Sequence, residues 1–123
     1  MDNHINYITT CGKHLDEIPT PCGPLSRDVY ILHYVAEGKG FLDFGNKHIH
    51  IKKGQSFLIR PYIFAHYYPD PSDPWRYIWV NFRGAEFENL INKIRFINSN
   101  CVIDYTNPKY TFDYYSIICD EFF

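Results

Sequence analysis

The stretch of this sequence best suited to chemistry is residues 75–81, Trp-Arg-Tyr-Ile-Trp-Val-Asn. In a β-strand the side chains alternate between two faces, which would place Trp75, Tyr77, Trp79 and Asn81 together. An indole ring offers a flat apolar surface to the C–H side of a sugar, and a tyrosine hydroxyl both donates and accepts hydrogen bonds. This face suits carbohydrate binding if it points into a cavity. The alternative is that the tryptophans simply fill the core.

Two further polar side chains are candidates for ligand binding. His33 lies in the apolar run of residues 29–35, on the same face as Ile31 and Val35 if that run is a strand. It is either a buried, hydrogen-bonded histidine or a group that faces a pocket. Arg27 precedes the same run, where a charged side chain is either solvated or available to a ligand.

Patterns for metal binding and catalysis are weak. His48 and His50 have a spacing found at metal sites, but strand alternation places both opposite Ile49 and Ile51, which we expect to be buried. The chain contains no GxSxG, no HExxH and no glycine-rich phosphate loop. We therefore predict no metal site, no cofactor and no catalytic residue, and we expect that the protein is not an enzyme.

Composition limits the size of the fold and the range of partners. The chain has 123 residues, 46% of them hydrophobic, which suffices for one domain with its own core. A formal net charge of -2 gives no basic face for nucleic acid, so we do not expect these residues to bind DNA themselves. Neither a signal peptide nor an apolar run of about 18 residues is present, which predicts a cytoplasmic location without membrane contact. The cysteines show no CxxC pairing and are predicted to be reduced thiols: Cys11, Cys22, Cys101 and Cys119.

Short strands separated by turns must position the candidate residues. β-branched and aromatic residues predict strands at 29–35, 41–44, 47–51, 56–60, 64–68 and 77–82. Tight turns, where glycine often supplies a positive φ, are expected at Gly38, Gly40, Gly45 and Gly54. This spacing favours a β-sandwich or a small barrel.

The two ends of the chain differ from this β region. Residues 1–28 are rich in proline and glycine and predict an irregular arm with one short strand near residues 7–9, followed by the β core at 29–84. We expect residues 85–123 to form a helical and linking region. It begins with a helix of about three turns, whose apolar side holds Phe87, Leu90, Ile91 and Ile94. A second apolar stripe covers Phe112, Tyr115, Ile118, Cys119 and Phe122. It indicates either the start of a dimerisation helix or an ordinary frayed terminus.

Three motifs, in the order found here, give the sequence a family resemblance. They are residues 27–40 (RDVYILHYVAEGKG), 54–61 (GQSFLIRP) and 73–84 (DPWRYIWVNFRG). The sequence resembles the N-terminal effector-binding domain of AraC-type transcription regulators over about residues 20–95. The resemblance implies an all-β, cupin-like jelly-roll barrel closed by the N-terminal arm and followed by one or two α-helices used for dimerisation. It also implies a C-terminal helix-turn-helix domain that binds DNA and has no counterpart in this sequence.

The resemblance also assigns candidate site residues. Arabinose-binding members place a stacking tryptophan, two polar contacts and a threonine of the arm at positions that match Trp79, Tyr77, Tyr67 and Thr9. An arginine that grips sugar hydroxyls in those members falls near Gly23 here, which puts arabinose itself in doubt. Arg27 lies close by and is the candidate replacement.

Three functions follow as hypotheses. The first is a homodimeric domain that binds a small-molecule effector, a sugar or related metabolite, and controls DNA binding by the missing domain. The second is a metal-dependent cupin enzyme, an isomerase or oxygenase; the place of the usual first ligand pair, near Arg27 and Asp28, holds no histidine. The third is a structural dimerisation module with a filled barrel.

Overall fold

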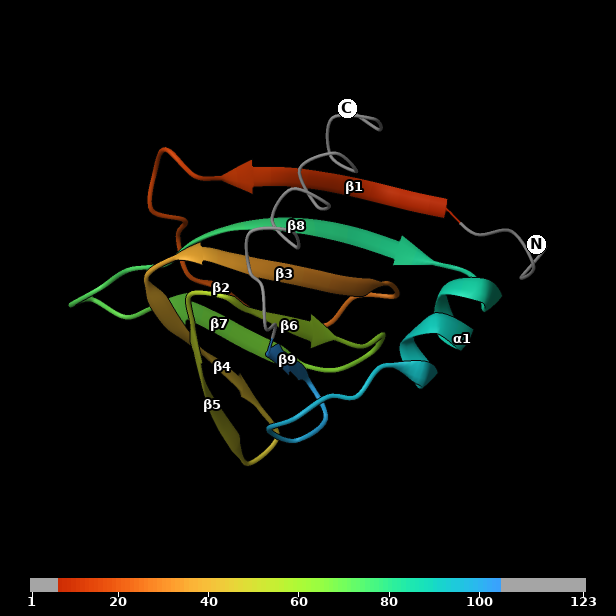
Figure 1. Ribbon diagram of the computed structural model, residues 1–123. Coiled ribbons are helices and arrows are strands. Elements are labelled where there is room, and N and C mark those ends of the chain that lie inside the picture. The colour runs from red at the N-terminus through yellow and green to blue at the C-terminus, as the bar shows by residue number, and fades with distance from the viewer. Residues whose placement is uncertain (1–6, 105–123) are drawn as a thin grey trace.

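The computed structural model describes residues 7–104, which form nine β-strands and one α-helix (Figure 1). Each strand predicted between residues 29 and 82 is present, with its ends shifted by no more than two residues. In chain order the elements are β1 (Tyr7–His14), β2 (Cys22–Leu25), β3 (Tyr30–Glu37), β4 (Lys39–Phe44), β5 (Lys47–Lys52), β6 (Gln55–Ile59), β7 (Ala65–Pro69), β8 (Arg76–Arg83), α1 (Ala85–Lys93) and β9 (Val102–Asp104).

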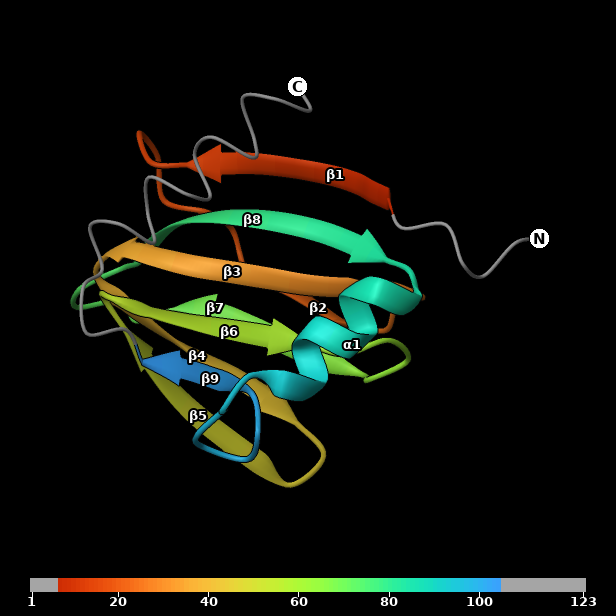
Figure 2. The same cartoon turned by 45° about the vertical axis from the view of Figure 1, so that its right-hand side comes forward.

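The strands form two antiparallel sheets that pack face to face. One sheet has the order β1-β8-β3-β6-β9 and the other the order β2-β7-β4-β5. Figure 2 shows the larger sheet running from β1 to β9, with the smaller sheet behind it. This arrangement is a cupin-like jelly roll, so the predicted fold class is confirmed. The apolar stripe at residues 112–122 lies outside the described residues.

The core between the two sheets follows the alternation of the strands. Ile49 and Ile51 are buried while His48 and His50 are exposed, as the pattern of β5 predicted. The buried side chains of this inner cluster are Val29, Ile31, Val35, Leu42, Ile49, Ile51, Phe57, Ile59, Ala65, Tyr67, Trp75, Tyr77, Cys101 and Val102.

A second apolar layer covers the outer face of the five-stranded sheet. In β8, Ile78 and Val80 point to this layer, on the opposite face from Tyr77. Helix α1 contributes Ile91, and Figure 2 shows the helix against this side of the sheet. The layer comprises Cys11, Leu32, Tyr34, Leu58, Ile78, Val80, Phe82 and Ile91.

The predicted apolar side of the helix is correct only in part. Ile91 is 4% exposed and Phe87 packs against the outer layer, but Leu90 is 56% exposed and Ile94 is also exposed. Helix α1 ends at Lys93, and Ile94 already has extended backbone. A helix this short reaches the sheet along a narrow stripe, and Leu90 lies beside that stripe.

The N-terminal region is more regular than predicted. The strand expected near residues 7–9 continues to His14 and pairs with β8 along its length, and a further strand, β2, pairs with β7. The prediction of a mainly irregular arm was therefore wrong for these segments. Both strands form by pairing with partners far along the chain, which local composition does not reveal.

One of the four glycines predicted to lie in turns, Gly40, lies in a strand instead. Gly38 adopts a φ of 71°, and Gly45 and Gly54 also have positive φ, as predicted. Gly40 instead lies within β4, where a Cβ atom would come within 2.3 Å of the Trp75 ring. Glycine is needed there because the indole packs directly on the backbone.

Candidate ligand-binding pocket

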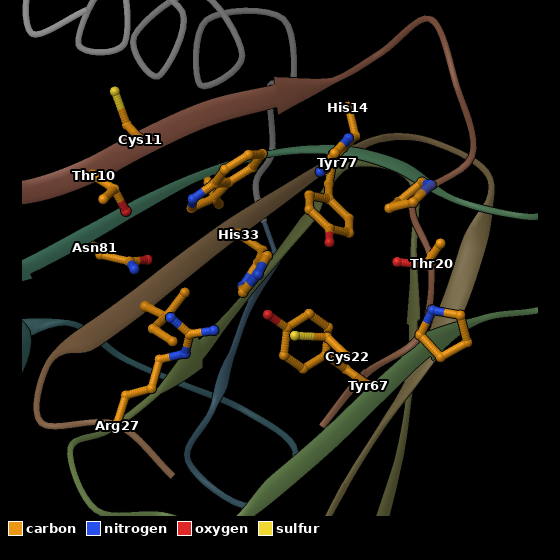
Figure 3. A pocket seen from close by; sticks show the side chains of 14 residues that line it. Thr10, Cys11, His14, Thr20, Cys22, Arg27, His33, Tyr67, Tyr77 and Asn81 are labelled. Carbon is orange, nitrogen blue, oxygen red and sulfur yellow. The ribbon is translucent and has the colours of Figure 1, made fainter. Parts of the chain in front are cut away.

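A pocket of about 480 Å³ opens between the two sheets (Figure 3). Its volume falls in the range of small-molecule sites, roughly 300–1,000 Å³. Residues from both sheets and from the segment between β1 and β2 line it: Thr10, Cys11, His14, Pro19, Thr20, Pro21, Cys22, Arg27, Ile31, His33, Tyr67, Tyr77, Trp79 and Asn81.

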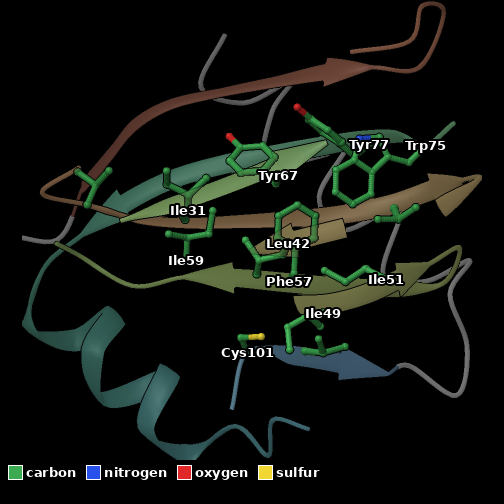
Figure 4. Close-up of a cluster of buried hydrophobic side chains, with 14 residues drawn as sticks. Ile31, Leu42, Ile49, Ile51, Phe57, Ile59, Tyr67, Trp75, Tyr77 and Cys101 are labelled. Carbon is green, nitrogen blue, oxygen red and sulfur yellow. The ribbon is translucent and has the colours of Figure 1, made fainter. Parts of the chain in front are cut away.

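Strand β8 supplies one wall of the pocket. Tyr77, Trp79 and Asn81 all line it, as expected for alternate residues of one strand. Trp75 shares this face but is buried deeper, in the inner cluster. Tyr77 belongs both to the pocket and to that cluster, so the pocket lies directly against the core (Figure 4).

The Trp79 indole is held in place by β1. Gly12 is its partner in the β1–β8 ladder, and a Cβ atom on Gly12 would come within 2.3 Å of the indole. The His14 ring stacks on the indole with a centroid distance of 4.9 Å and an interplanar angle of 20°. His14 also meets Tyr77 edge to face at 5.6 Å. Backbone and side chain of β1 together fix the indole at the pocket wall.

His33 lies on β3 among aromatic rings. It stacks on Phe57 at 4.2 Å and meets Tyr67 and Tyr77 edge to face at 4.8 and 4.9 Å. The ring is 1% exposed and its Nδ1 atom has no hydrogen-bond partner. Burial lowers the pKa of His33 to about 3, and the positive charge of Arg27 acts in the same direction. His33 is therefore uncharged near neutral pH.

The two tyrosine hydroxyls of the pocket are also uncharged. Burial raises the pKa of Tyr67 well above its ordinary value, and a hydrogen bond with the Cys22 side chain adds to the shift. Burial likewise raises the pKa of Tyr77. Neutral hydroxyls can both donate and accept, so the pocket offers hydrogen-bonding groups of either kind.

The structure gathers five of the six predicted site residues around one space: Arg27, His33, Tyr67, Tyr77 and Trp79. Thr9 is not among the lining residues. The register of β1 shifts between Ile8 and Thr10, so that Thr10 pairs with Asn81 and lines the pocket. The Thr9 hydroxyl instead donates to the Asn81 carbonyl oxygen at 3.3 Å.

Sequence reasoning did not select several residues that line the pocket. Asn81 had a usable signal, because it alternates with Tyr77 and Trp79 on one strand. His14 and Cys22 had none, since their places depend on how β1 and β2 pair with distant strands.

Within residues 7–104, no group of three or more His, Cys, Asp or Glu side chains is arranged to hold a metal ion. His48 and His50 lie on the outside of the smaller sheet, away from the pocket. The same residues include no helix long and apolar enough to cross a membrane.

Comparison with known proteins identifies the family of this chain. Residues 20–116 match the family model of the AraC-like ligand binding domain, which covers most of the chain. The chain belongs to this family. The match extends from β2 beyond β9, so the matched segment contains every described strand except β1.

Two curated relatives of this AraC-like ligand binding domain are operon regulators. It is 37% identical over 71 residues to the Msm operon regulatory protein of Streptococcus mutans serotype c, covering 58% of this chain and 26% of the relative. It is 35% identical over 68 residues to the raffinose operon transcriptional regulatory protein RafR of Pediococcus pentosaceus, covering 54% of this chain and 24% of the relative. The matched part thus spans about a quarter of each regulator.

Proposed function

We propose that this domain is the effector-sensing part of a transcription regulator, that its pocket binds a sugar, and that it performs no reaction on it. The observation that carries the proposal is the pocket itself, which combines an indole wall with uncharged hydrogen-bonding groups. The family and the two operon regulators support the regulatory role.

A sugar has the two kinds of surface that this pocket complements. Its C–H face would pack on an aromatic wall, for which Trp79 is the candidate. Its hydroxyls would exchange hydrogen bonds with Tyr67, Tyr77 and His33. The exposed Arg27 would donate a hydrogen bond to one further hydroxyl. Thr10 takes the place that the family resemblance gives to Thr9.

The relatives narrow the choice of sugar to test first. RafR is named for a raffinose operon. Raffinose and galactose, one of its component sugars, are therefore the first probes.

The proposed signal passes through the N-terminal region. Thr10 and His14 of β1, together with residues 19–22, line the pocket. A ligand that contacts them favours one position of this region, and it can shift the regulator only by the difference in its affinity for the two states. DNA would be bound by helix-turn-helix units outside this chain, in the cytoplasm.

We also propose that the regulator is a homodimer. The apolar stripe at residues 112–122 is the candidate contact, since such a face is unfavourable in water. Light scattering across a range of protein concentrations should show association, and mass that stays monomeric at every concentration would contradict it.

Calorimetry with raffinose and galactose tests the sugar proposal. We expect Trp79→Ala to weaken binding at least tenfold, about 1.4 kcal/mol, through loss of the stacking surface. Phe64→Ala is the control, because Phe64 is an exposed aromatic outside the pocket. Failure of the wild-type domain to bind any neutral sugar, with binding of another metabolite class, would overturn the assignment.

A further inference from the structure

Three polar atoms of the pocket are buried without a hydrogen bond: His14 Nδ1, His33 Nδ1 and Asn81 Oδ1. His14 Nδ1 has the Glu17 carboxylate at 3.4 Å, so the other two need an explanation. His33 and Asn81 are 1% and 7% exposed. Leaving such a group unpaired costs about 1–3 kcal/mol. Their position in the pocket indicates that the missing partners belong to a ligand.

The two residues lie close together on one face of the larger sheet. His33 pairs with Trp79 and Asn81 pairs with Ile31, so His33 and Asn81 are diagonal neighbours on β3 and β8. Diagonal neighbours in an antiparallel pair are roughly 7–8 Å apart, a separation that one sugar can bridge. Figure 3 shows both side chains pointing into the same space.

The chemistry of these atoms selects the kind of ligand group. An amide oxygen only accepts hydrogen bonds, and a neutral imidazole nitrogen donates or accepts according to its tautomer. A hydroxyl satisfies both. A carboxylate has no proton near neutral pH to give to Asn81 Oδ1, and buried, uncharged His33 provides no opposite charge.

We propose that His33 and Asn81 form an inner polar subsite that binds ligand hydroxyls and rejects a ligand carrying a negative charge at that end. The inference rests on the proposed function, because it concerns the same pocket. The positive charge of Arg27 reaches His33, whose pKa it helps to lower, but Arg27 is exposed and water screens its charge. It therefore offsets only part of a negative charge buried between His33 and Asn81.

The subsite requires a small adjustment when ligand binds. Both unpartnered atoms are shielded from water by their neighbours, so a hydroxyl reaches them once the Asn81 amide and the adjacent rings shift slightly. These atoms are already desolvated, and the hydrogen bonds gained with the ligand therefore do not compete with bound water.

Three variants separate this role from a structural one. Asn81→Leu removes the amide at similar volume, and His33→Phe removes the nitrogen while keeping a ring to stack on Phe57. Ser56→Ala is the matched control, since Ser56 Oγ is also buried and unpartnered but lies outside the pocket. We expect the first two to weaken raffinose and galactose binding about tenfold each without lowering Tm, and Ser56→Ala to leave affinity unchanged.

A second measurement needs only the wild-type domain. We expect galactose to bind at least tenfold tighter than galacturonate. Equal affinity for these two, or pocket variants that fold and bind galactose as the wild type does, would overturn the subsite while leaving the sugar-sensing proposal intact. Absence of binding to any neutral sugar would overturn both.

Discussion

Gly12 lies directly opposite Trp79 in the β1–β8 ladder, and the indole occupies the space that a side chain at position 12 would need. The Trp79 wall of the pocket can lie where it does because Gly12 of β1 has no Cβ atom. Residues of the N-terminal strand and of β8 must fit together for the pocket to keep its shape.

Gly12→Val should displace the indole, because even a Cβ would come within 2.3 Å of it. We expect a shift in tryptophan fluorescence and at least a tenfold loss of raffinose affinity by calorimetry. Gly45→Asn is the control, since a Cβ there meets nothing within 4 Å and asparagine tolerates its φ of 57°. An unchanged spectrum and affinity in Gly12→Val would show that the wall does not depend on this contact.

Gly40→Ala should destabilise the core rather than the pocket. Its Cβ would come within 2.3 Å of Trp75, which is 1% exposed and has little room to move. Overpacking of this kind costs about 1–3 kcal/mol, to be measured by urea denaturation. Lys47→Ala, an exposed change in β5, should have no measurable effect.

His33 should make stability depend on pH. The folded ring has a pKa of about 3, against an ordinary 6.5, with burial the main cause and the nearby Arg27 and His14 acting in the same direction. Between these values the unfolded state binds more protons, so the stabilising contribution is complete above pH 6.5 and is lost as the pH falls toward 3. The loss from this residue is about 2 kcal/mol between pH 7 and 5.

Urea denaturation of the wild type and His33→Phe at pH 7 and 5 checks this. The variant should lose about 2 kcal/mol less than the wild type, because the titration of the other groups is common to both. Equal losses would mean that His33 titrates alike in the folded and unfolded states.

Ile91 and Leu90 are neighbours in α1 with opposite environments. Ile91→Ala should lower the free energy of unfolding by about 2–4 kcal/mol, because Ile91 is 4% exposed and packs in the outer layer. Leu90→Ala should change it by less than about 0.5 kcal/mol, since Leu90 is 56% exposed. Similar values for the two variants in urea denaturation would contradict the packing of α1.

Local patterns predicted what depends on local geometry. The alternation in β5 placed Ile49 inside and His50 outside, and the alternation in β8 placed Tyr77 and Trp79 on one face, because successive strand residues always point in opposite directions.

Features that depend on distant pairing escaped prediction. The register shift beside Thr9 brings Thr10 to the pocket, and only the ladder with β8 reveals it. Gly40 was predicted to lie in a turn, whereas glycine is needed there because the Trp75 ring, far along the chain, packs on its backbone. The helical pattern indicated the side of α1 that packs, but not how narrow the contact is, which is why Leu90 was misplaced.

The first strand has one neighbour within its sheet, β8, and lies at the sheet edge. Like the other edge strands β9, β2 and β5, it has a backbone ladder on one side only, so it can loosen without disturbing the rest of its sheet. A ligand in the pocket would contact Thr10 and His14 and so hold β1 against its sheet. Ligand binding would then slow the local opening of β1, which limited proteolysis or amide hydrogen exchange can measure.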